Sequence, residues 1–122
     1  TDTLPAFYSR SSGLPVDARV ENAIQAAQVI SASRLLGMGH GVLIAVPVPE
    51  GMEMPTEAAE LAIEQATAEA EVQGIHGKAV TPFVLGRVAE LTEGESRRSN
   101  VSLLVNNARV GGLIAVELSR GS

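Results

Sequence analysis

Apolar positions in two stretches of the chain recur at intervals of three and four residues, which places them on one face of an α-helix. In residues 22–36, Asn22 is a suitable N-cap and Gly37 ends the pattern. In residues 55–74 an alanine-rich stripe faces one way and glutamates surround the other side. The stripe consists of Ala59, Ala62, Ile63, Ala66 and Ala70. The pattern therefore predicts helices over 22–36 and 55–74.

Two more helices are predicted in the second half of the chain. In "TPFVLGRVAELT", Thr81 fits the N-cap and Pro82 the first helical position, and the helix is expected to continue to about Leu91. After the turn "TEGES", a last helix is expected over residues 96–118. Its small and apolar residues recur at helical spacing, so we expect close packing along that face. These residues are Val101, Leu104, Ala108, Gly112 and Ala115.

One strand is predicted, over residues 41–46. The sequence "GVLIAV" is a short, continuous apolar run with β-branched residues, and prolines follow it, which is typical of a strand buried on both faces. A single strand cannot stand alone because its backbone groups need neighbours. Other segments, or another copy of the chain, must therefore complete the sheet. Residues 1–20 contain Pro, Gly and Ser and indicate extended chain and loop.

The last helix carries three asparagines, although asparagine forms helices poorly. Asn106 and Asn107 lie about 100° apart on the helical wheel, so we expect one on the surface and the other packed and hydrogen-bonded. Asn100 lies in the first turn, beside backbone N–H groups that have no partner within the helix and suit a polar ligand. Its amide offers a donor and an acceptor. A local backbone hydrogen bond is the alternative role for Asn100.

Composition and charge exclude several classes of protein. The chain has 122 residues, 45% of them apolar, and a net charge of −5, so it suits one folded domain and is a poor partner for nucleic acid. It has no cysteine, which excludes disulfides and thiolate chemistry. No apolar run approaches the roughly 18 residues that a membrane span needs, and no signal-peptide pattern is present. We therefore expect a cytoplasmic protein without membrane contact, with organellar import left open.

Other residues of the chain could carry chemistry, but each also has an ordinary structural interpretation. "GMGHG" (37–41) resembles a phosphate-binding loop, but it follows a helix and precedes a strand, which favours a helix-ending turn. His40 and His76 lack the spacing of zinc ligands. "SRSSG" (9–13) could form an anion-binding nest, with loop solvation as the commoner outcome. Lys78, the single lysine, could form a Schiff base but lies in a polar linker.

Three segments together resemble one enzyme family. They are "PAFYSRSSGLPVDARV", "GVLIAVPVPEG" and "AEAEVQGIHGKAVTPFVLGRVAELTEGES…SNVSLLVNNARVGG". Their order and spacing are similar to the C-terminal part of the pseudouridine-5'-phosphate glycosidases. The resemblance covers nearly the whole chain, and the stretch "GKAVTPFVLGRVAELT" is its most specific part.

The resemblance implies a fold and an activity. The expected fold class is α/β: the C-terminal part of an α/β/α sandwich, mostly helical with one clear buried strand, whose sheet is completed by missing or partner segments. Residues 1–122 would be a single domain or fragment, the C-terminal half of the glycosidase domain. The family reversibly cleaves the C–C glycosidic bond of pseudouridine 5'-phosphate to uracil and ribose 5-phosphate. The resemblance also implies an Mn²⁺ cofactor and a homotrimeric full-length protein.

The resemblance also implies site residues. It places an active-site asparagine at Asn100, in "SNVSLL", with a substrate-binding and supporting catalytic role. A Schiff-base lysine, a proton-donating glutamate and a metal-binding aspartate would all precede Thr1, and Lys78 matches a linker instead. We therefore expect no metal ligand in this chain and no glycosidase activity from the chain alone.

The sequence leaves two questions about the resemblance open. Val46 stands where the family has an asparagine before the proline, and a fusion of the parent protein to a sugar kinase is undetermined. The alternative function is a non-catalytic helical oligomerisation or scaffold module. Its interface would be the stripe Ala59–Ala70 and the small residues of the last helix.

Overall fold

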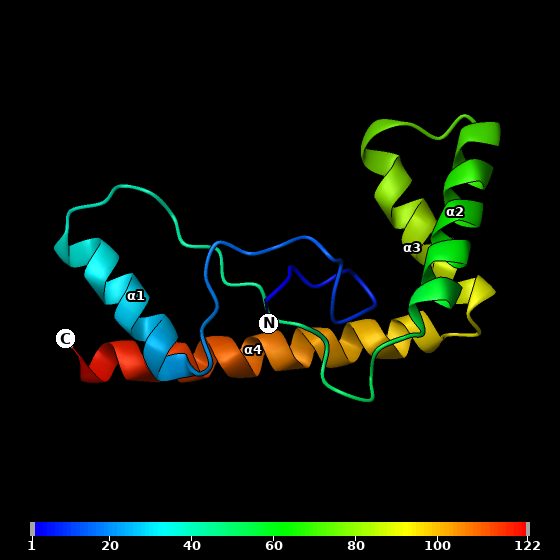
Figure 1. Cartoon of the computed structure of the whole chain (residues 1–122). Coiled ribbons are helices and arrows are strands. Elements are labelled where there is room, and N and C mark those ends of the chain that lie inside the picture. The colour runs from blue at the N-terminus through cyan, green and yellow to red at the C-terminus, as the bar shows by residue number, and fades with distance from the viewer. Residues whose placement is uncertain (1, 122) are drawn as a thin grey trace.

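A long helix forms the base of the molecule, and the other helices pack at its two ends (Figure 1). The computed structural model describes residues 2–121, so Thr1 and Ser122 lie outside it. Helix α1 packs against the C-terminal part of α4, and α2 and α3 form an antiparallel pair at the opposite end. The elements are α1 (Ala23–Leu35), α2 (Thr56–Val72), the 3₁₀ turn η1 (Gly77–Ala79), α3 (Val80–Leu91) and α4 (Glu95–Arg120).

The ends of α1 confirm the sequence-based prediction. The Asn22 side chain caps the helix by accepting a hydrogen bond from the Gln25 backbone N–H at 3.0 Å. At the other end Gly37 has a φ of +67°, and its N–H donates to the Arg34 carbonyl at 3.0 Å. This left-handed residue is the usual way to end a helix. The glycine-rich stretch after α1 is therefore a helix-ending turn, as predicted.

The start of α3 differs from the prediction. The helix begins at Val80, after the turn Gly77–Ala79, so Thr81 is not its N-cap and Pro82 is its third residue. A proline is tolerated there because the first N–H groups of a helix have no intrahelical acceptor. The end at Leu91 and the following turn are as predicted.

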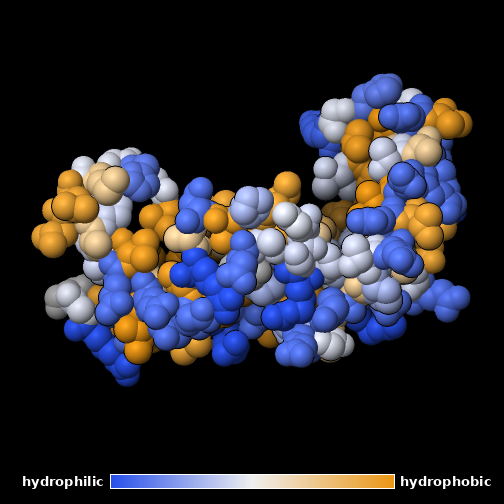
Figure 2. Space-filling model, in the orientation of Figure 1, coloured by the Kyte–Doolittle hydropathy of each residue, from blue (hydrophilic) through white to orange (hydrophobic). Residues whose placement is uncertain are grey.

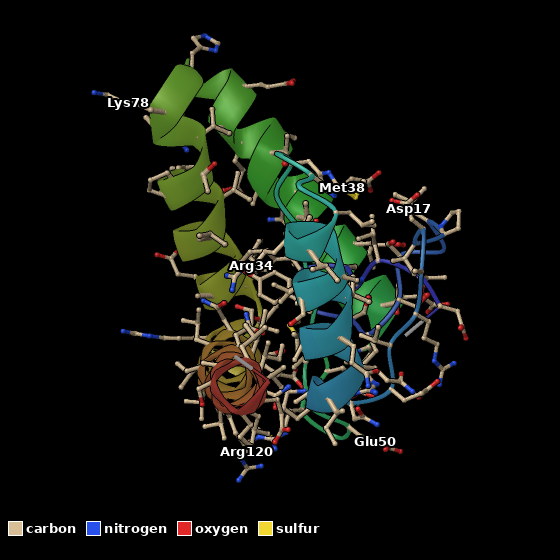
Figure 3. All side chains as sticks on the ribbon, turned by 90° about the vertical axis from the view of Figure 1, so that its left-hand side faces the viewer. Asp17, Arg34, Met38, Glu50, Lys78 and Arg120 are labelled. Atoms are coloured by element: carbon tan, nitrogen blue, oxygen red, sulfur yellow. The ribbon has the colours of Figure 1, made fainter. Side chains whose placement is uncertain are left out.

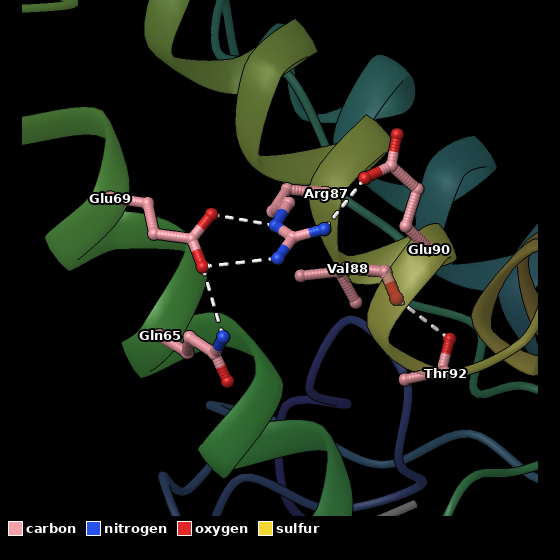
Figure 4. A network of polar contacts seen from close by, with 6 residues as sticks. All are labelled: Gln65, Glu69, Arg87, Val88, Glu90 and Thr92. Carbon is pink, nitrogen blue, oxygen red and sulfur yellow. Dashed lines mark hydrogen bonds and ion pairs between the residues drawn. The ribbon is translucent and has the colours of Figure 1, made fainter. Parts of the chain in front are cut away.

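The core lies between α2 and α3. The four alanines of the predicted stripe, Ala59, Ala62, Ala66 and Ala70, are buried there, and Ile63 is partly buried. Val88 of α3 is fully buried against the stripe. Small side chains let the two helices approach closely. On the rim of this interface Arg87 of α3 binds Glu69 of α2 (Figure 4). Because α3 of the same chain covers the stripe, the stripe cannot serve as the oligomer interface of a scaffold module.

The predicted strand is not formed in the described part of the chain. Residues 41–49 are neither helix nor strand, and between residues 2 and 121 the one β-bridge is the isolated pair Thr3 and Pro15. Leu43 is 89% exposed and Val42 is also exposed, so the segment is not buried on both faces here. The backbone of 41–46 has no strand partner to pair with. The mostly helical character is confirmed, and the α/β class stays a prediction.

The expected packing face of α4 is open in this structure. Val101, Leu104 and Gly112 are exposed, and a Cβ placed on Gly112 would meet no atom within 4 Å. The other side of the helix contacts α1, where Ile114 is buried. Hydrophobic side chains also reach the surface at the end of the molecule that α1 forms (Figure 2).

By length and composition, α4 is also long and apolar enough to cross a membrane, the one such helix among residues 2–121. The expectation that nothing in the chain approaches a membrane span therefore needs correction for this helix. A core helix passes the same test. Asn106, Asn107 and Arg109 lie near its middle, and such polar side chains are costly in lipid. Their position favours a helix that contacts protein.

Candidate functional site

A small cavity lies where the N-terminal segment, α3 and the first turns of α4 meet. Its volume is about 250 Å³. Asn100 lines it and is half-buried, so the structure brings this predicted site residue to a concave surface. The other lining residues are Tyr8, Leu85, Gly86, Ala89, Ser96 and Arg97. The cavity thus combines an apolar α3 wall with polar groups from α4 and the N-terminal segment.

Tyr8 of the N-terminal segment lines the cavity. It is 4% exposed, and its ring packs edge-on against Phe7 with the ring centres 4.7 Å apart. Its carbonyl accepts a hydrogen bond from the Met54 N–H at 2.9 Å. Burial raises the pKa of the Tyr8 phenol above its ordinary value, and a hydrogen bond with Ser96 opposes this rise in part. The phenol is therefore neutral near pH 7, with its hydroxyl available for hydrogen bonding.

The first turns of α4 are fixed by a sharp turn after α3. Glu93 and Gly94 both have positive φ angles, +50° and +80°, and Glu93 is the one non-glycine residue with such an angle among residues 2–121. The Ser96 N–H donates to the Thr92 Oγ1 at 3.2 Å, and the Thr92 hydroxyl donates to the Val88 carbonyl at 2.7 Å. The start of α4 is thereby tied to the core residue Val88.

The three asparagines have different environments, as predicted. The Asn106 amide donates to the Pro47 carbonyl at 3.3 Å and accepts from Arg109 at 3.1 Å, whereas Asn107 is exposed. Asn106 is thus the packed structural amide and Asn107 the surface one. Asn100 instead lines the cavity.

The loop "SRSSG" uses its polar groups to build its own turn. The Ser12 hydroxyl donates to the Leu4 carbonyl at 2.7 Å, and the Ser11 hydroxyl accepts from the Gly13 N–H at 3.2 Å. Arg10 donates to the Val48 carbonyl at 2.6 Å. A nest needs free N–H groups aimed at an anion. The structure therefore supports a structural role for residues 9–13.

The remaining sequence candidates do not meet at the cavity. Lys78 is exposed at the tip of the α2–α3 pair (Figure 3), while the cavity lies at the base of that pair. His40 and His76 are exposed as well. Within residues 2–121 no group of three or more His, Asp or Glu side chains could hold a metal ion. The described residues therefore do not fit an Mn²⁺ site.

Sequence reasoning missed Tyr8 and Ser96 as neighbours of Asn100. They lie far apart in the chain, and no local pattern links them. Ser96 stands four residues before Asn100 in the predicted helix, a spacing that places both on one face. That spacing was the one available indication in the sequence.

Comparisons with known proteins show the family to which the chain belongs. Residues 1–117 match the model of a family described as indigoidine synthase A like protein, and the chain belongs to this family. It is 50% identical to the pseudouridine-5'-phosphate glycosidase of Caldanaerobacter subterraneus over 120 residues, and 44% identical to that of Escherichia coli. Both matches cover 98% of this chain, and they cover 39% and 38% of the respective relatives.

Solved structures of other proteins are similar to this one. A prealnumycin C-glycosynthase in complex with ribulose 5-phosphate superposes with a TM-score of 0.86 at 32% identity, over 98% of this chain and 39% of that one. An indigoidine synthase A-like protein from Thermotoga maritima gives 0.82 at 33% identity, over 97% and 38%. The chain thus spans less than half the length of the relatives it matches, and its fold follows theirs over that length.

Proposed function

We propose that this chain is part of a longer enzyme that reversibly cleaves the C–C glycosidic bond of pseudouridine 5'-phosphate, giving uracil and ribose 5-phosphate. The match of 98% of the chain, at 50% identity, to a pseudouridine-5'-phosphate glycosidase carries this proposal. The likeness to a C-glycosynthase supports chemistry at the same kind of bond.

In this proposal Asn100 binds the uracil ring. A uracil edge presents donors and acceptors side by side, and an amide offers both. Asn100 lies half-buried in a cavity with one apolar wall, a surrounding that suits a flat ring. Its position on α4 would hold the base still while the glycosidic bond reacts, so its role is binding with a supporting part in catalysis.

The remaining machinery would lie outside this chain. The resemblance implies a Schiff-base lysine, a proton-donating glutamate and an aspartate that holds Mn²⁺, and we place all three in the rest of the protein. Lys78 is no substitute, because it is exposed at the opposite end of α3 from the cavity. The isolated chain would accordingly be inactive.

The open surfaces fit a part of a larger α/β/α domain. The exposed residues Val42 and Leu43 would enter a sheet as the strand 41–46, and the apolar face of α4 would pack under other segments. Burial of such faces is the main source of stability in layered folds. We also propose the homotrimer that the resemblance implies.

The activity is tested by incubating the full-length protein with pseudouridine 5'-phosphate and Mn²⁺ and measuring free uracil. We expect turnover by the full-length protein and none by the 122-residue chain. Absence of turnover by the full-length protein would refute the proposed function. Turnover by the isolated chain that disappears in Lys78→Ala would refute the assignment of roles.

The role of Asn100 is tested by Asn100→Ala in the full-length enzyme. We expect kcat/KM to fall about 10- to 100-fold, the cost of leaving buried polar groups of a ligand unpaired. The melting temperature should stay nearly constant. The matched control is Asn107→Ala, an exposed asparagine of the same helix, which should leave kinetics unchanged. Unchanged kinetics in Asn100→Ala, or collapse of its fold, would return Asn100 to a structural role.

A scaffold module remains the second candidate, because the α4 face around Val101 and Leu104 is open. An intact-mass measurement of the source protein separates the two. A parent of the relatives' length supports the enzyme, and a native product of 122 residues supports the module.

A further inference from the structure

We propose that Arg97 binds the 5'-phosphate of the substrate at the mouth of the cavity and so makes the enzyme prefer phosphorylated substrates. This inference rests on the proposed function, because it places a second group of pseudouridine 5'-phosphate in the site where Asn100 binds the uracil ring. Arg97 and Asn100 both line the cavity of about 250 Å³. Arg97 thus becomes a specificity-determining residue of that site.

The lining of this cavity is positive, although the chain as a whole is negative. The chain carries 14 acidic residues against 9 basic ones, which gives a net charge of −5. Among the described residues that line the cavity, Arg97 is the one charged side chain, and there is no carboxylate. Because most of the chain repels an anion, a local cation decides where a phosphate can bind.

The guanidinium of Arg97 is free for a ligand in the described part of the chain. Most other arginine side chains are engaged in ion pairs or hydrogen bonds. These are Arg10, Arg19, Arg87, Arg109 and Arg120. Within residues 2–121 the Arg97 side chain forms neither kind of contact, so it can bind a ligand without breaking a contact of the fold. Arg34 and Arg98 share this property, but neither lines the cavity.

The position of Arg97 on α4 suits a phosphate that stays at the mouth of the cavity. Arg97 precedes Asn100 by three residues, a spacing that makes them neighbours on the helix surface, with about 5–6 Å between their Cβ atoms. Asn100 is half-buried, whereas Arg97 is exposed. In this arrangement the uracil ring lies deeper, against the apolar α3 wall, and the phosphate keeps part of its hydration. The ion pair thereby avoids the cost of complete burial.

The chemistry of arginine matches this task. A guanidinium stays protonated at neutral pH and binds a phosphate through two parallel N–H···O hydrogen bonds. When a substrate lacks the phosphate, the exposed Arg97 stays solvated, so its selectivity comes from an added attraction. Arg97 therefore acts on the binding of the phosphorylated compound and not on the chemical step.

Arg97→Met in the full-length enzyme tests this contact in the synthesis direction, in which uracil and ribose 5-phosphate are joined. We expect KM for ribose 5-phosphate to rise about tenfold, the lower part of the range for a hydrogen bond to a charged group, because Arg97 is exposed. KM for uracil should stay constant within about twofold, whereas Asn100→Ala should raise it. Arg97→Lys keeps the charge without the planar geometry and should recover part of the loss.

Arg98→Met is the matched control. Arg98 is the adjacent exposed arginine, it is also unpaired within residues 2–121, and it does not line the cavity. This variant should leave both KM values unchanged. An unchanged KM for ribose 5-phosphate in Arg97→Met would overturn the proposal, and so would an equal rise of both KM values. The same loss in Arg98→Met would also overturn it, because it would indicate a general effect of charge.

Calorimetric titration of ribose 5-phosphate into the full-length wild type and Arg97→Met requires no turnover, so it separates this proposal from the proposed function. An affinity about tenfold weaker in the variant supports the phosphate contact, and equal affinities overturn it. An inactive wild type refutes the proposed function, whatever the titration gives. Arg97→Gln replaces Arg97→Met if the methionine variant does not fold.

Discussion

The guanidinium of Arg87 in α3 donates two hydrogen bonds to the carboxylate of Glu69 in α2, from Nε to Oε2 at 2.6 Å and from Nη2 to Oε1 at 3.2 Å (Figure 4). Glu90 accepts from the third guanidinium nitrogen at 2.7 Å, and Gln65 donates to Glu69 at 2.9 Å. The Arg87 and Glu69 side chains are 32% and 29% exposed. This bidentate geometry joins α2 to α3, the helix that forms one wall of the cavity.

Replacing Arg87 by methionine should lower the melting temperature of the full-length protein. Methionine keeps an apolar side chain at this position, but it leaves the Glu69 carboxylate without its cation. It also loses part of the packing that the arginine side chain contributes at the rim of the helix pair. The control is Arg120→Met, which breaks the pair with Glu117 at the exposed end of α4 and should change little. Equal melting temperatures for the wild type and Arg87→Met would contradict a stabilising role for the pair.

The same pair should make stability depend on pH in the acid range. Arg87, as the largest cause, and Gln65 hold the pKa of the Glu69 carboxyl below its ordinary value of 4.5. A carboxyl group whose pKa is lowered by folding contributes to the free energy of unfolding. That contribution is fully present above the pKa of the unfolded state and is lost as the pH falls through the pKa of the folded state. The wild type should therefore lose stability faster below about pH 4.5 than Glu69→Gln, in melting curves taken across that range. Parallel pH profiles would contradict this linkage.

Asn106→Ala should destabilise the protein although alanine is the better helix former. It removes the bond to the Pro47 carbonyl, which lies 59 residues away and holds the 41–49 segment against α4. We expect a loss of about 0.5–1.5 kcal/mol in urea unfolding. Asn107 is exposed, so Asn107→Ala should be neutral or should stabilise the protein by up to about 0.5 kcal/mol. Equal effects of the two substitutions would show that the Pro47 contact contributes nothing.

Gly112→Leu tests whether other segments cover the open face of α4. Gly112 has free space around it here, so the leucine itself meets no clash within this chain. If the rest of the enzyme packs on this face, the substitution should overfill the contact and destabilise the full-length protein by about 1–3 kcal/mol. Ser119→Leu, at the exposed end of the same helix, is the control. A neutral Gly112→Leu in thermal unfolding would show that the face stays open.

The helices could be predicted from the sequence because their determinants are local. Asn22 caps α1 and Gly37 ends it, and each acts on backbone groups only a few residues away. The alanines of α2 recur at helical spacing, which can be recognised within that segment alone. The sequence pattern predicts the start of α3 too late in the chain, because Thr81 and Pro82 are typical of an N-cap and a first helical residue. The turn Gly77–Ala79 begins the helical conformation earlier.

The candidate site was predicted only in part. The prediction that Asn100 lies in the first turn of the last helix was wrong, because α4 begins at Glu95 and Asn100 is its sixth residue, in the second turn. The structure nevertheless places Asn100 on a cavity, as expected of a site residue. The serines of residues 9–13 could not be assigned from sequence, because a hydroxyl that builds a turn and one that binds an anion look alike there. Hydrogen-bond partners such as Leu4 decide between the two roles.

The sequence by itself determined where the helices lie, which alanines face the core, and which family the chain resembles, since periodicity, capping and motif spacing are properties of neighbouring residues. Only the tertiary structure decided that α3 covers the alanine stripe, that Asn106 rather than Asn107 is the packed amide, and that Tyr8 and Asn100 line one cavity. These facts depend on contacts between residues tens of positions apart. The path of the connecting loops sets such contacts, and no short stretch of sequence encodes it.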